Sequence, residues 1–306
     1  MYTIPSAPTI ARPRKRRVTR HGKQYWRQAG IGILFALPSL AGCMLFIIVP
    51  FFDALRRSFS NGMQVFVGFQ NYRDIFTNAS FLRAIQNTGR FIGLCVPVLI
   101  VISLALALML SDRTYGRGAL RAAFLMPMAI PVASIALLWQ ILFNRSGVIN
   151  GLLMQIGVQG VDWMKTDWAL FCLVLSYVWK NIGYTMVLFI AGLAGINQSL
   201  YEAAAVDGAG KVRRFFSITL PCLRPTLFTV TVLSLLNSFK AYREAYLVAG
   251  NYPQGSIYLL QHTLNNWFTN MEIEKLSAAA ISTALVILVL VALLNWAWSI
   301  DASWEA

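Results

Sequence analysis

The sequence predicts an all-α membrane protein with six transmembrane helices, and three observations support this fold class. Of the 306 residues, 57% are hydrophobic and only 12% are charged, which is too apolar a composition for a soluble domain of this length. Six apolar stretches are each long enough to cross about 30 Å of hydrocarbon. A basic segment precedes the first of them, so the sequence indicates one membrane domain over residues 29–306 behind a tail over residues 1–28.

The tail contains eight Lys and Arg residues, three prolines and no acidic residue. This composition predicts a disordered cytoplasmic segment that lies against anionic lipid headgroups. A signal peptide is the alternative interpretation. The apolar run that follows, residues 31–52, is longer than a typical signal-peptide core and lacks a small-residue cleavage site, so we interpret it as the first transmembrane helix.

Five further apolar stretches predict the remaining membrane spans. They are residues 91–110, 122–143, 168–196, 226–249 and 276–300. Three of the six spans are interrupted by proline, at Pro38, at Pro97, and at Pro127 with Pro131. Proline frees a backbone carbonyl and kinks a helix, which membrane helices use for functional bending but also tolerate in inert bundles.

The distribution of positive charge predicts the orientation. With both termini in the cytoplasm, the cytoplasmic segments are the tail, residues 111–121 and residues 197–225, and they contain fifteen Lys and Arg residues. The outer loops, 53–90, 144–167 and 250–275, are longer in total and contain eight. An excess of cations on the cytoplasmic side is the usual pattern of membrane proteins.

The charged loop over residues 197–225 has a recognisable local pattern. Ser199 and Glu202 form a Ser-x-x-Glu capping arrangement, which predicts a helix that begins at residue 200. Gly208 and Gly210 interrupt this helix, and a second helical stretch is expected to end at Pro221. As a local pattern, Glu202 needs no role beyond capping.

The longer pattern resembles a known family. Its residues, in order and at fixed spacing, are Glu202, Ala203, Ala204, Gly208, Ile218, Leu220 and Pro221. This spacing is similar to the EAA loop of permease subunits in binding-protein-dependent ABC importers, and Asp207, Ala209 and Pro225 resemble its sugar branch of maltose and glycerol-phosphate type. Two segments depart from the pattern. Residues 197–199 lack the proline that many relatives have there. Residues 249–256, with the sequence AGNYPQGS, stand in place of the two-glycine-and-proline segment that is common among maltose-type relatives.

The resemblance implies a type I ABC importer permease in a bacterial inner membrane, whose loop is a coupling helix seated in a cleft of an ATPase subunit. It also implies four kinds of partner: a second homologous permease, two ATP-binding cassette subunits, an extracytoplasmic solute-binding protein, and a sugar or oligosaccharide as solute. A permease for an amino acid or a peptide is the alternative. A membrane-embedded enzyme or assembly factor is the remaining class, and the sequence offers no acid-base or nucleophile set for it.

No cofactor is expected on this chain. Residues 208–211 resemble the end of a phosphate-binding loop, but Ala205 and Val212 stand where that motif needs Gly and Ser or Thr, so ATP is expected on a separate subunit. The four cysteines are far apart and His21 and His262 are expected to be solvated, which leaves no disulfide or metal pattern. The net charge of +14 comes largely from the tail beside a membrane span, so no nucleic acid is expected as partner.

Polar residues inside the predicted spans indicate a solute path, because a charge at the centre of a span costs at least about 2.5–3.5 kcal/mol and should face protein or water. The candidates are Trp179, Lys180, Tyr184, Asn237, Lys240 and Tyr242. Amide and ammonium donors beside aromatic rings suit a sugar. Two alternatives stay open: Lys180 can snorkel to a headgroup, and Lys240 can simply pair with Glu244 four residues later.

Overall fold

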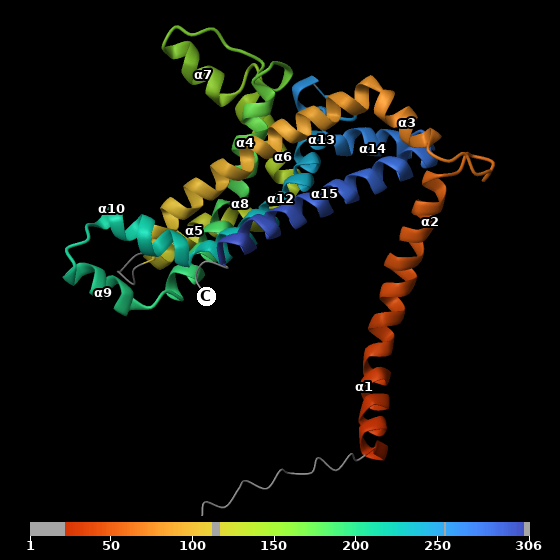
Figure 1. Cartoon of the computed structure of the whole chain (residues 1–306). Coiled ribbons are helices and arrows are strands. Elements are labelled where there is room, and N and C mark those ends of the chain that lie inside the picture. Colours follow the sequence, from red (N-terminus) through yellow and green to blue (C-terminus); the bar gives the residue numbers. More distant parts are fainter. Residues whose placement is uncertain (1–21, 112–116, 254, 303–306) are drawn as a thin grey trace, which may run out of the picture. The chain divides into compact units, whose positions relative to one another are not determined.

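The computed structural model describes residues 22–111, 117–253 and 255–302, and the chain divides into two units, Met1–Asp53 and Ala54–Ala306 (Figure 1). In the described part of the chain the regular elements are helices, and the only β pairing is a single bridge between Ser60 and Phe66. This agrees with the predicted all-α class.

The first unit is built on α1 (Gly22–Cys43), which continues through a π-helical turn, Met44–Ile48, into α2 (Val49–Ser58). Residues 30–58 are long and apolar enough to cross a membrane, as predicted, and their large apolar side chains are exposed as far as Phe52. The prediction that the whole tail is disordered is wrong for residues 22–28, which are helical. The rest of the tail, residues 1–21, lies outside the described residues.

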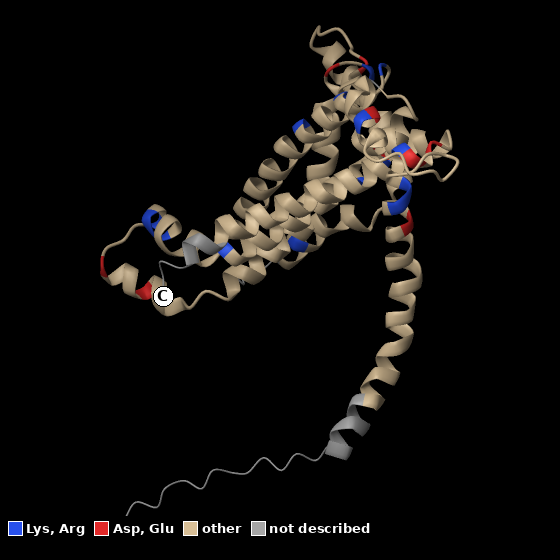
Figure 2. Cartoon of the chain, turned by 45° about the vertical axis from the view of Figure 1, so that its right-hand side comes forward, with Lys and Arg blue, Asp and Glu red and all other residues tan. Residues whose placement is uncertain are grey.

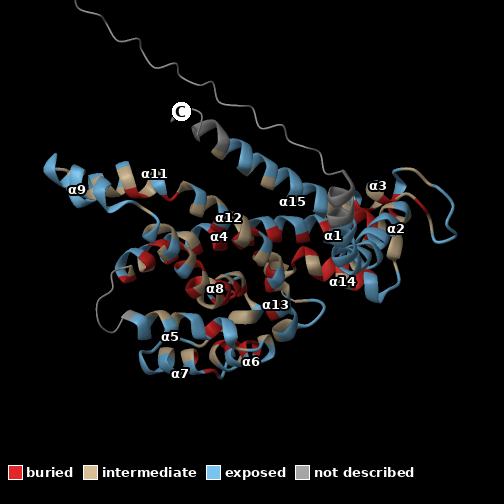
Figure 3. Cartoon of the chain, turned by 90° about the horizontal axis from the view of Figure 1, so that it is seen from below, coloured by how far each residue is buried: buried red, intermediate tan, exposed pale blue. Residues whose placement is uncertain are grey.

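The second unit is a helical bundle around α8 (Ala169–Ala194), with α4 packed against it. Figure 3 shows α8 end-on among its neighbours and largely buried. Its buried residues point in all directions around the helix axis, from Cys172 and Ser176 to Tyr177, Gly183 and Phe189. A helix that is apolar on all sides has to be surrounded by other helices, which explains why this span occupies the centre.

The second predicted span is longer than expected, since α4 covers Ala79–Leu110 and begins twelve residues before residue 91. The Asn78 side chain accepts a hydrogen bond from Phe81 N at 3.0 Å and caps the helix there. Phe81 is buried against α14 (Leu260–Thr269). The first turns of α4 are stabilised by packing against α14. The predicted span missed them because it was drawn from hydropathy alone.

The third predicted span, residues 122–143, is broken in two. It consists of α5 (Arg117–Ala129) and α6 (Val132–Phe143), separated at Ile130 and Pro131. Pro127 lies inside α5 without ending it, whereas Pro131 is the N-cap of α6 and its carbonyl accepts from Ile135 N at 3.1 Å. The predicted bend is therefore a complete helix break at the second proline.

The last two spans follow the prediction closely. The fifth consists of α12 (Arg224–Ser238), a 3-10 turn, Phe239–Ala241, and α13 (Tyr242–Ala249), and the sixth is α15 (Ile273–Ala302). Within the described residues, five helical segments are long and apolar enough to cross a membrane. There are six if the segment over residues 211–249, which is bent by 66°, counts as one. Figure 2 shows that the charged residues lie mostly at the two ends of the bundle.

Three short helices in the connections were not predicted from the sequence. They are α3 (Gln70–Thr77), α7 (Val148–Gln155) and α14. All lie at the end of the bundle that we call the α14 end, opposite the α9 end formed by the predicted coupling loop (Figure 1). Each is too short to give a hydropathy signal of its own.

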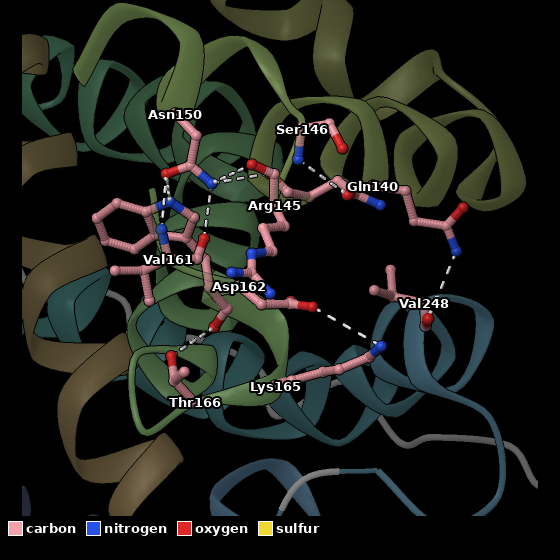
Figure 4. Close-up of polar contacts among 11 residues, drawn as sticks. Gln140, Arg145, Ser146, Asn150, Val161, Asp162, Lys165, Thr166 and Val248 are labelled. Carbon is pink, nitrogen blue, oxygen red and sulfur yellow. Dashed lines mark hydrogen bonds and ion pairs between the residues drawn. The ribbon is translucent and has the colours of Figure 1, made fainter. Parts of the chain in front are cut away.

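One buried side chain organises the loop around α7 (Figure 4). Asn150 Nδ2 donates to the carbonyl oxygens of Asn144, Arg145 and Val161 at 2.9, 3.1 and 2.6 Å. Its Oδ1 accepts from Val161 N at 3.2 Å and from Trp163 Nε1 at 3.0 Å. The side chain thereby joins both ends of the loop between α6 and α8.

Candidate functional site

The predicted coupling loop forms two helices joined by a turn at the α9 end of the bundle (Figure 1). The first is α9 (Gln198–Val206) and the second is α10 (Lys211–Arg214). The predicted cap is wrong by two residues: Asn197 is the N-cap, and its Oδ1 accepts from Ser199 N at 3.1 Å. Asn caps a helix at least as well as Ser, so the helix begins at the earlier position and includes Ser199.

The turn after α9 needs a glycine. Gly208 has a φ of +74°, and its N–H donates to Ala205 O at 3.1 Å while Ala209 N–H donates to Ala204 O at 2.9 Å. These two bonds form a Schellman motif, which ends a helix with one residue in the left-handed region. The motif gives the predicted bend its physical cause, and Asp207 occupies the C-cap position before it.

The second half of the loop returns to the bundle without ending where the sequence predicted. After α10 the chain continues through a π-helical turn, Phe215–Thr219, into α11 (Leu220–Cys222). Pro221 is at the start of α11, where its missing N–H costs nothing, so helical structure passes the proline instead of stopping there. The chain then bends by 66° into α12.

Side chains tie this loop to the bundle. Tyr201 on α9 shares a hydrogen bond of 2.8 Å with the hydroxyl of Thr219, which is buried. Leu223, at the bend, is fully buried. At Gly192 the helix α8 lies so close to α12 that an added Cβ would come within 2.4 Å of Thr226 Oγ1. The loop therefore projects from a closely packed base.

The projecting part of the loop presents apolar side chains to its surroundings. None of the residues of α9 is buried, and Val206 and Val212 are 89% and 72% exposed. Of the motif residues, Glu202, Ala203, Asp207 and Gly208 are exposed, Ala204 is half-buried, and Ile218, Leu220 and Pro221 are half-buried at the base. Exposed apolar side chains gathered on one projection are typical of a protein-docking surface.

Two of the predicted solute-path residues come together in a narrow crevice between α8 and α12. Tyr184 and Asn237 both line it, together with Asn181, which was not among the predicted path residues. Lys240 Nζ donates to Asn237 Oδ1 at 2.8 Å. The lining of the crevice therefore includes two amides, two phenols and two hydroxyl side chains besides four aliphatic residues. The ammonium group of Lys240 is held on one of those amides.

The other predicted path residues lie elsewhere. Lys180 Nζ is 2.5 Å from Glu244 Oε1, so this lysine forms an ion pair between α8 and α13 and does not snorkel. The predicted alternative of a Lys240–Glu244 pair is wrong for the same reason. Trp179 packs edge-on against Trp139 at 5.8 Å between ring centres, on the side of α6.

The remaining candidate, Tyr242, packs against a buried histidine at the α14 end. Its ring centre is 4.7 Å from that of His262. His262 was expected to be solvated, but it is fully buried, and its Nδ1 accepts from Leu259 N at 3.1 Å. Burial lowers the pKa of the imidazole to about 4, so it is neutral near pH 7. Its distance in sequence from any apolar span hid this burial.

Comparison with known proteins places the fold and these features in a family. Residues 99–299 match the family described as "Binding-protein-dependent transport system inner membrane component". The chain is 34% identical over 273 residues to the trehalose/maltose transport system permease protein MalF of Thermococcus litoralis, across 87% of this chain and 92% of MalF. It is 33% identical over 265 residues to the sn-glycerol-3-phosphate transport system permease protein UgpA of Yersinia enterocolitica, across 84% and 89% of the two chains.

Solved structures give the same result. A chain of a bacterial ABC transporter involved in the import of the acidic polysaccharide alginate has a TM-score of 0.79 at 25% identity, across 90% of this chain and 98% of that one. The same kind of transporter in complex with a periplasmic protein that carries an alginate pentasaccharide gives 0.76 at 25% identity, across 90% and 96%. The predicted type I importer permease fold is thus confirmed. The chain belongs to the family of inner membrane components of binding-protein-dependent transport systems.

Proposed function

We propose that this protein is a transmembrane subunit of an ATP-driven sugar importer and that it couples to a separate ATPase through residues 198–222. The observation that carries the proposal is the projecting α9–α10 turn, in which the family-like motif residues stand exposed around the Schellman turn at Gly208. The names of the relatives support a sugar as solute, since they concern trehalose, maltose and alginate.

The geometry suggests how the coupling works. ATP binds to two cassette subunits, and their closure pushes on the exposed face of α9 around Ala203 and Val206. The Tyr201–Thr219 hydrogen bond holds α9 to the helical segment that leads into α12. Because α8 and α12 touch at Gly192, a displacement of the loop has to move both helices together. Rigid-body rotation of packed helices is a common way to convert such a push into opening of a gate.

The solute path is proposed to run along the crevice at Tyr184, Asn181 and Asn237, which is closed in this structure and has to widen before a sugar can pass. Amides supply both donors and acceptors for sugar hydroxyls, and a tyrosine ring packs against the apolar face of a sugar. A second, homologous permease would form the other wall. An extracytoplasmic binding protein would deliver solute at the α14 end, and both chain termini would then lie in the cytoplasm.

Reversing the charge of Glu202 tests the coupling. In the complete importer, reconstituted in vesicles, we expect Glu202→Lys to lower the amount of sugar imported per ATP hydrolysed, because an interfacial carboxylate replaced by a cation leaves unpaired charge. Glu202→Gln is the matched control and should retain part of the coupling. Unchanged import per ATP in Glu202→Lys would disprove the role of α9.

The solute path has its own test. Asn237→Ala and Tyr184→Ala should change which sugars are imported or raise the KM for them, while subunit assembly and ligand-independent ATP hydrolysis remain. Thr229→Ala is the control, because Thr229 lies on the same helix but its hydroxyl only bonds to the carbonyl of Pro225 at 3.0 Å. If both crevice variants import the same sugars with an unchanged KM, the path lies elsewhere.

A further inference from the structure

Three buried polar atoms belong to side chains that line one small cavity and come from three different helices. They are Trp139 Nε1 on α6, Ser176 Oγ on α8 and Glu244 Oε2 on α13. The three residues are only 8%, 3% and 7% exposed. Within residues 22–111, 117–253 and 255–302, none of these atoms has a hydrogen-bond partner. Buried polar atoms almost always have partners, so three such atoms around one cavity point to a small polar molecule that binds there.

The charge of Glu244 raises the cost of leaving one of its carboxylate oxygens without a partner. Its Oε1 accepts from Lys180 at 2.5 Å, which leaves Oε2 inside a largely apolar wall that includes Phe143, Leu173 and Val248. A buried ion pair is stable only where further hydrogen bonds satisfy the remaining lone pairs, because both ions have lost their water. Oε2 therefore requires a donor that the described protein groups do not supply.

The size and chemistry of the cavity limit the ligand. Its volume is about 10 Å³, which is enough for a single water molecule and far too small for a sugar. An indole N–H only donates, a carboxylate only accepts, and a serine hydroxyl does both. A water molecule matches this set, since it can accept from Trp139, donate to Glu244 and bond to Ser176. A metal ion does not, because it would be repelled by the indole N–H and by Lys180.

We propose that this cavity is the binding site of one ordered water molecule, and that the water and the Lys180–Glu244 ion pair form a fixed joint between α6, α8 and α13. No residue lines both this cavity and the crevice at Asn237. Lys180 then belongs to the joint and not to the solute path. The hydrogen bond of 3.4 Å from Gln140 on α6 to the carbonyl of Val248 on α13 closes the same contact (Figure 4).

The position of the joint gives it a mechanical role. Helix α8 leads into the α9–α10 turn, and α12 with α13 leads away from it. The ion pair joins α8 to α13, whereas the contact at Gly192 joins α8 to α12, the earlier part of the same span. Two connections between α8 and this span make them move as one body, which is what transmission from the coupling loop requires.

A structure of the intact importer, determined at a resolution that shows ordered water, tests the site directly. We expect one density peak within hydrogen-bond distance of Trp139 Nε1, Ser176 Oγ and Glu244 Oε2. Direct pairing of these atoms with protein groups, without such a peak, would overturn the proposal.

Radical footprinting of the importer tests the site in solution. Hydroxyl radicals formed from bound water should oxidise Trp139 severalfold faster in the native protein than in Ser176→Val, which fills the cavity. Trp267, which is equally buried but distant, should not change. An equal rate for Trp139 in both proteins contradicts a bound water.

The role of Lys180 is tested by removing one charge of the ion pair and then both. We expect Glu244→Gln to reduce the amount of assembled importer, because it leaves a buried ammonium group unpaired. The double variant Lys180→Met with Glu244→Met should restore assembly and import sugar with an unchanged KM. An assembled double variant whose KM is raised tenfold would mean that Lys180 touches the solute, and the joint would be refuted.

Discussion

At the scale of single residues, buried amides and rings stabilise parts of this protein that hydropathy does not reveal. Asn150 satisfies three carbonyl oxygens, one backbone N–H and one indole N–H, all within the loop between α6 and α8. The side chain is fully buried. If the amide were removed, each of these groups would lose its partner and could not bond to water instead.

We expect Asn150→Asp to open this loop. The carboxylate keeps the shape of the side chain but faces three carbonyl oxygens that it cannot donate to, at a cost of about 3 kcal/mol or more. Trypsin cleavage after Lys165, whose side chain is 83% exposed, should become faster in the purified importer. Asn144→Asp is the control, because Asn144 Oδ1 only accepts, from Ser146 N at 3.2 Å. An equal rate of cleavage in both variants would show that the hydrogen bonds of Asn150 do not hold this loop together.

His262 makes the stability depend on pH. Its pKa is lowered to about 4 by burial, whereas the unfolded chain has the usual value near 6.5. The unfolded state therefore binds more protons between these values, and stability should fall as the pH is lowered from about 6.5 to 4, by about 3 kcal/mol from this residue.

The measurement is the thermal midpoint of the importer over this pH range, compared with His262→Asn. The asparagine oxygen can still accept from Leu259 N, but the side chain does not titrate. We expect a flatter pH profile for the variant, and parallel profiles for the two proteins would contradict the assignment.

At the scale of whole elements, one glycine allows two helices to approach closely, more so than any other described glycine. At Gly183 on α8, an added Cβ would lie 2.0 Å from Phe124 O and 2.4 Å from Phe124 C on α5. Both are backbone atoms, so relief requires α5 to move as a helix. The broken third span can pack here only because α8 has no side chain at this position.

We expect Gly183→Ala to destabilise the bundle by about 3 kcal/mol or more, since overpacking against backbone cannot relax. The thermal midpoint of the purified subunit or importer should drop accordingly. Gly151→Ala on α7, where an added Cβ meets nothing within 4 Å, should leave the midpoint unchanged or raise it. A midpoint for Gly183→Ala equal to that of the control would show that α5 and α8 are not in this contact.

At the scale of the whole molecule, the six-span arrangement determines which face the coupling loop can reach. Gln70 on α3 and Gln155 on α7 lie at the α14 end, whereas Val212 lies on α10. All three are exposed. If α9 meets an ATPase, the α14 end has to lie outside the cell.

Single cysteines at these three positions test this orientation, in a background in which the exposed Cys43 and Cys222 are replaced by Ser. We expect Gln70→Cys and Gln155→Cys to react with a membrane-impermeant thiol reagent added to intact cells. Val212→Cys should react only after the membrane is opened. Labelling of Val212→Cys from outside would overturn the arrangement.

Sequence alone determined the features that depend on composition and local conformation. Hydropathy predicted the membrane spans, since a helix is the way a single segment satisfies its backbone in lipid. The bend at Gly208 was also predictable, because a positive φ is a local preference of glycine. The motif around Glu202 indicated the family that the comparisons confirmed.

Tertiary structure decided the features that depend on which helix lies beside which. Sequence spacing favoured Lys240 as the partner of Glu244, but Lys180, from a helix 64 residues earlier, takes that place. In the same way, packing between helices brings Asn237 and Tyr184 into one crevice and buries His262. A side chain's position in sequence specifies its own helix face, whereas the free energy of burying a charge depends on the atoms that surround it, and those come from elsewhere in the chain.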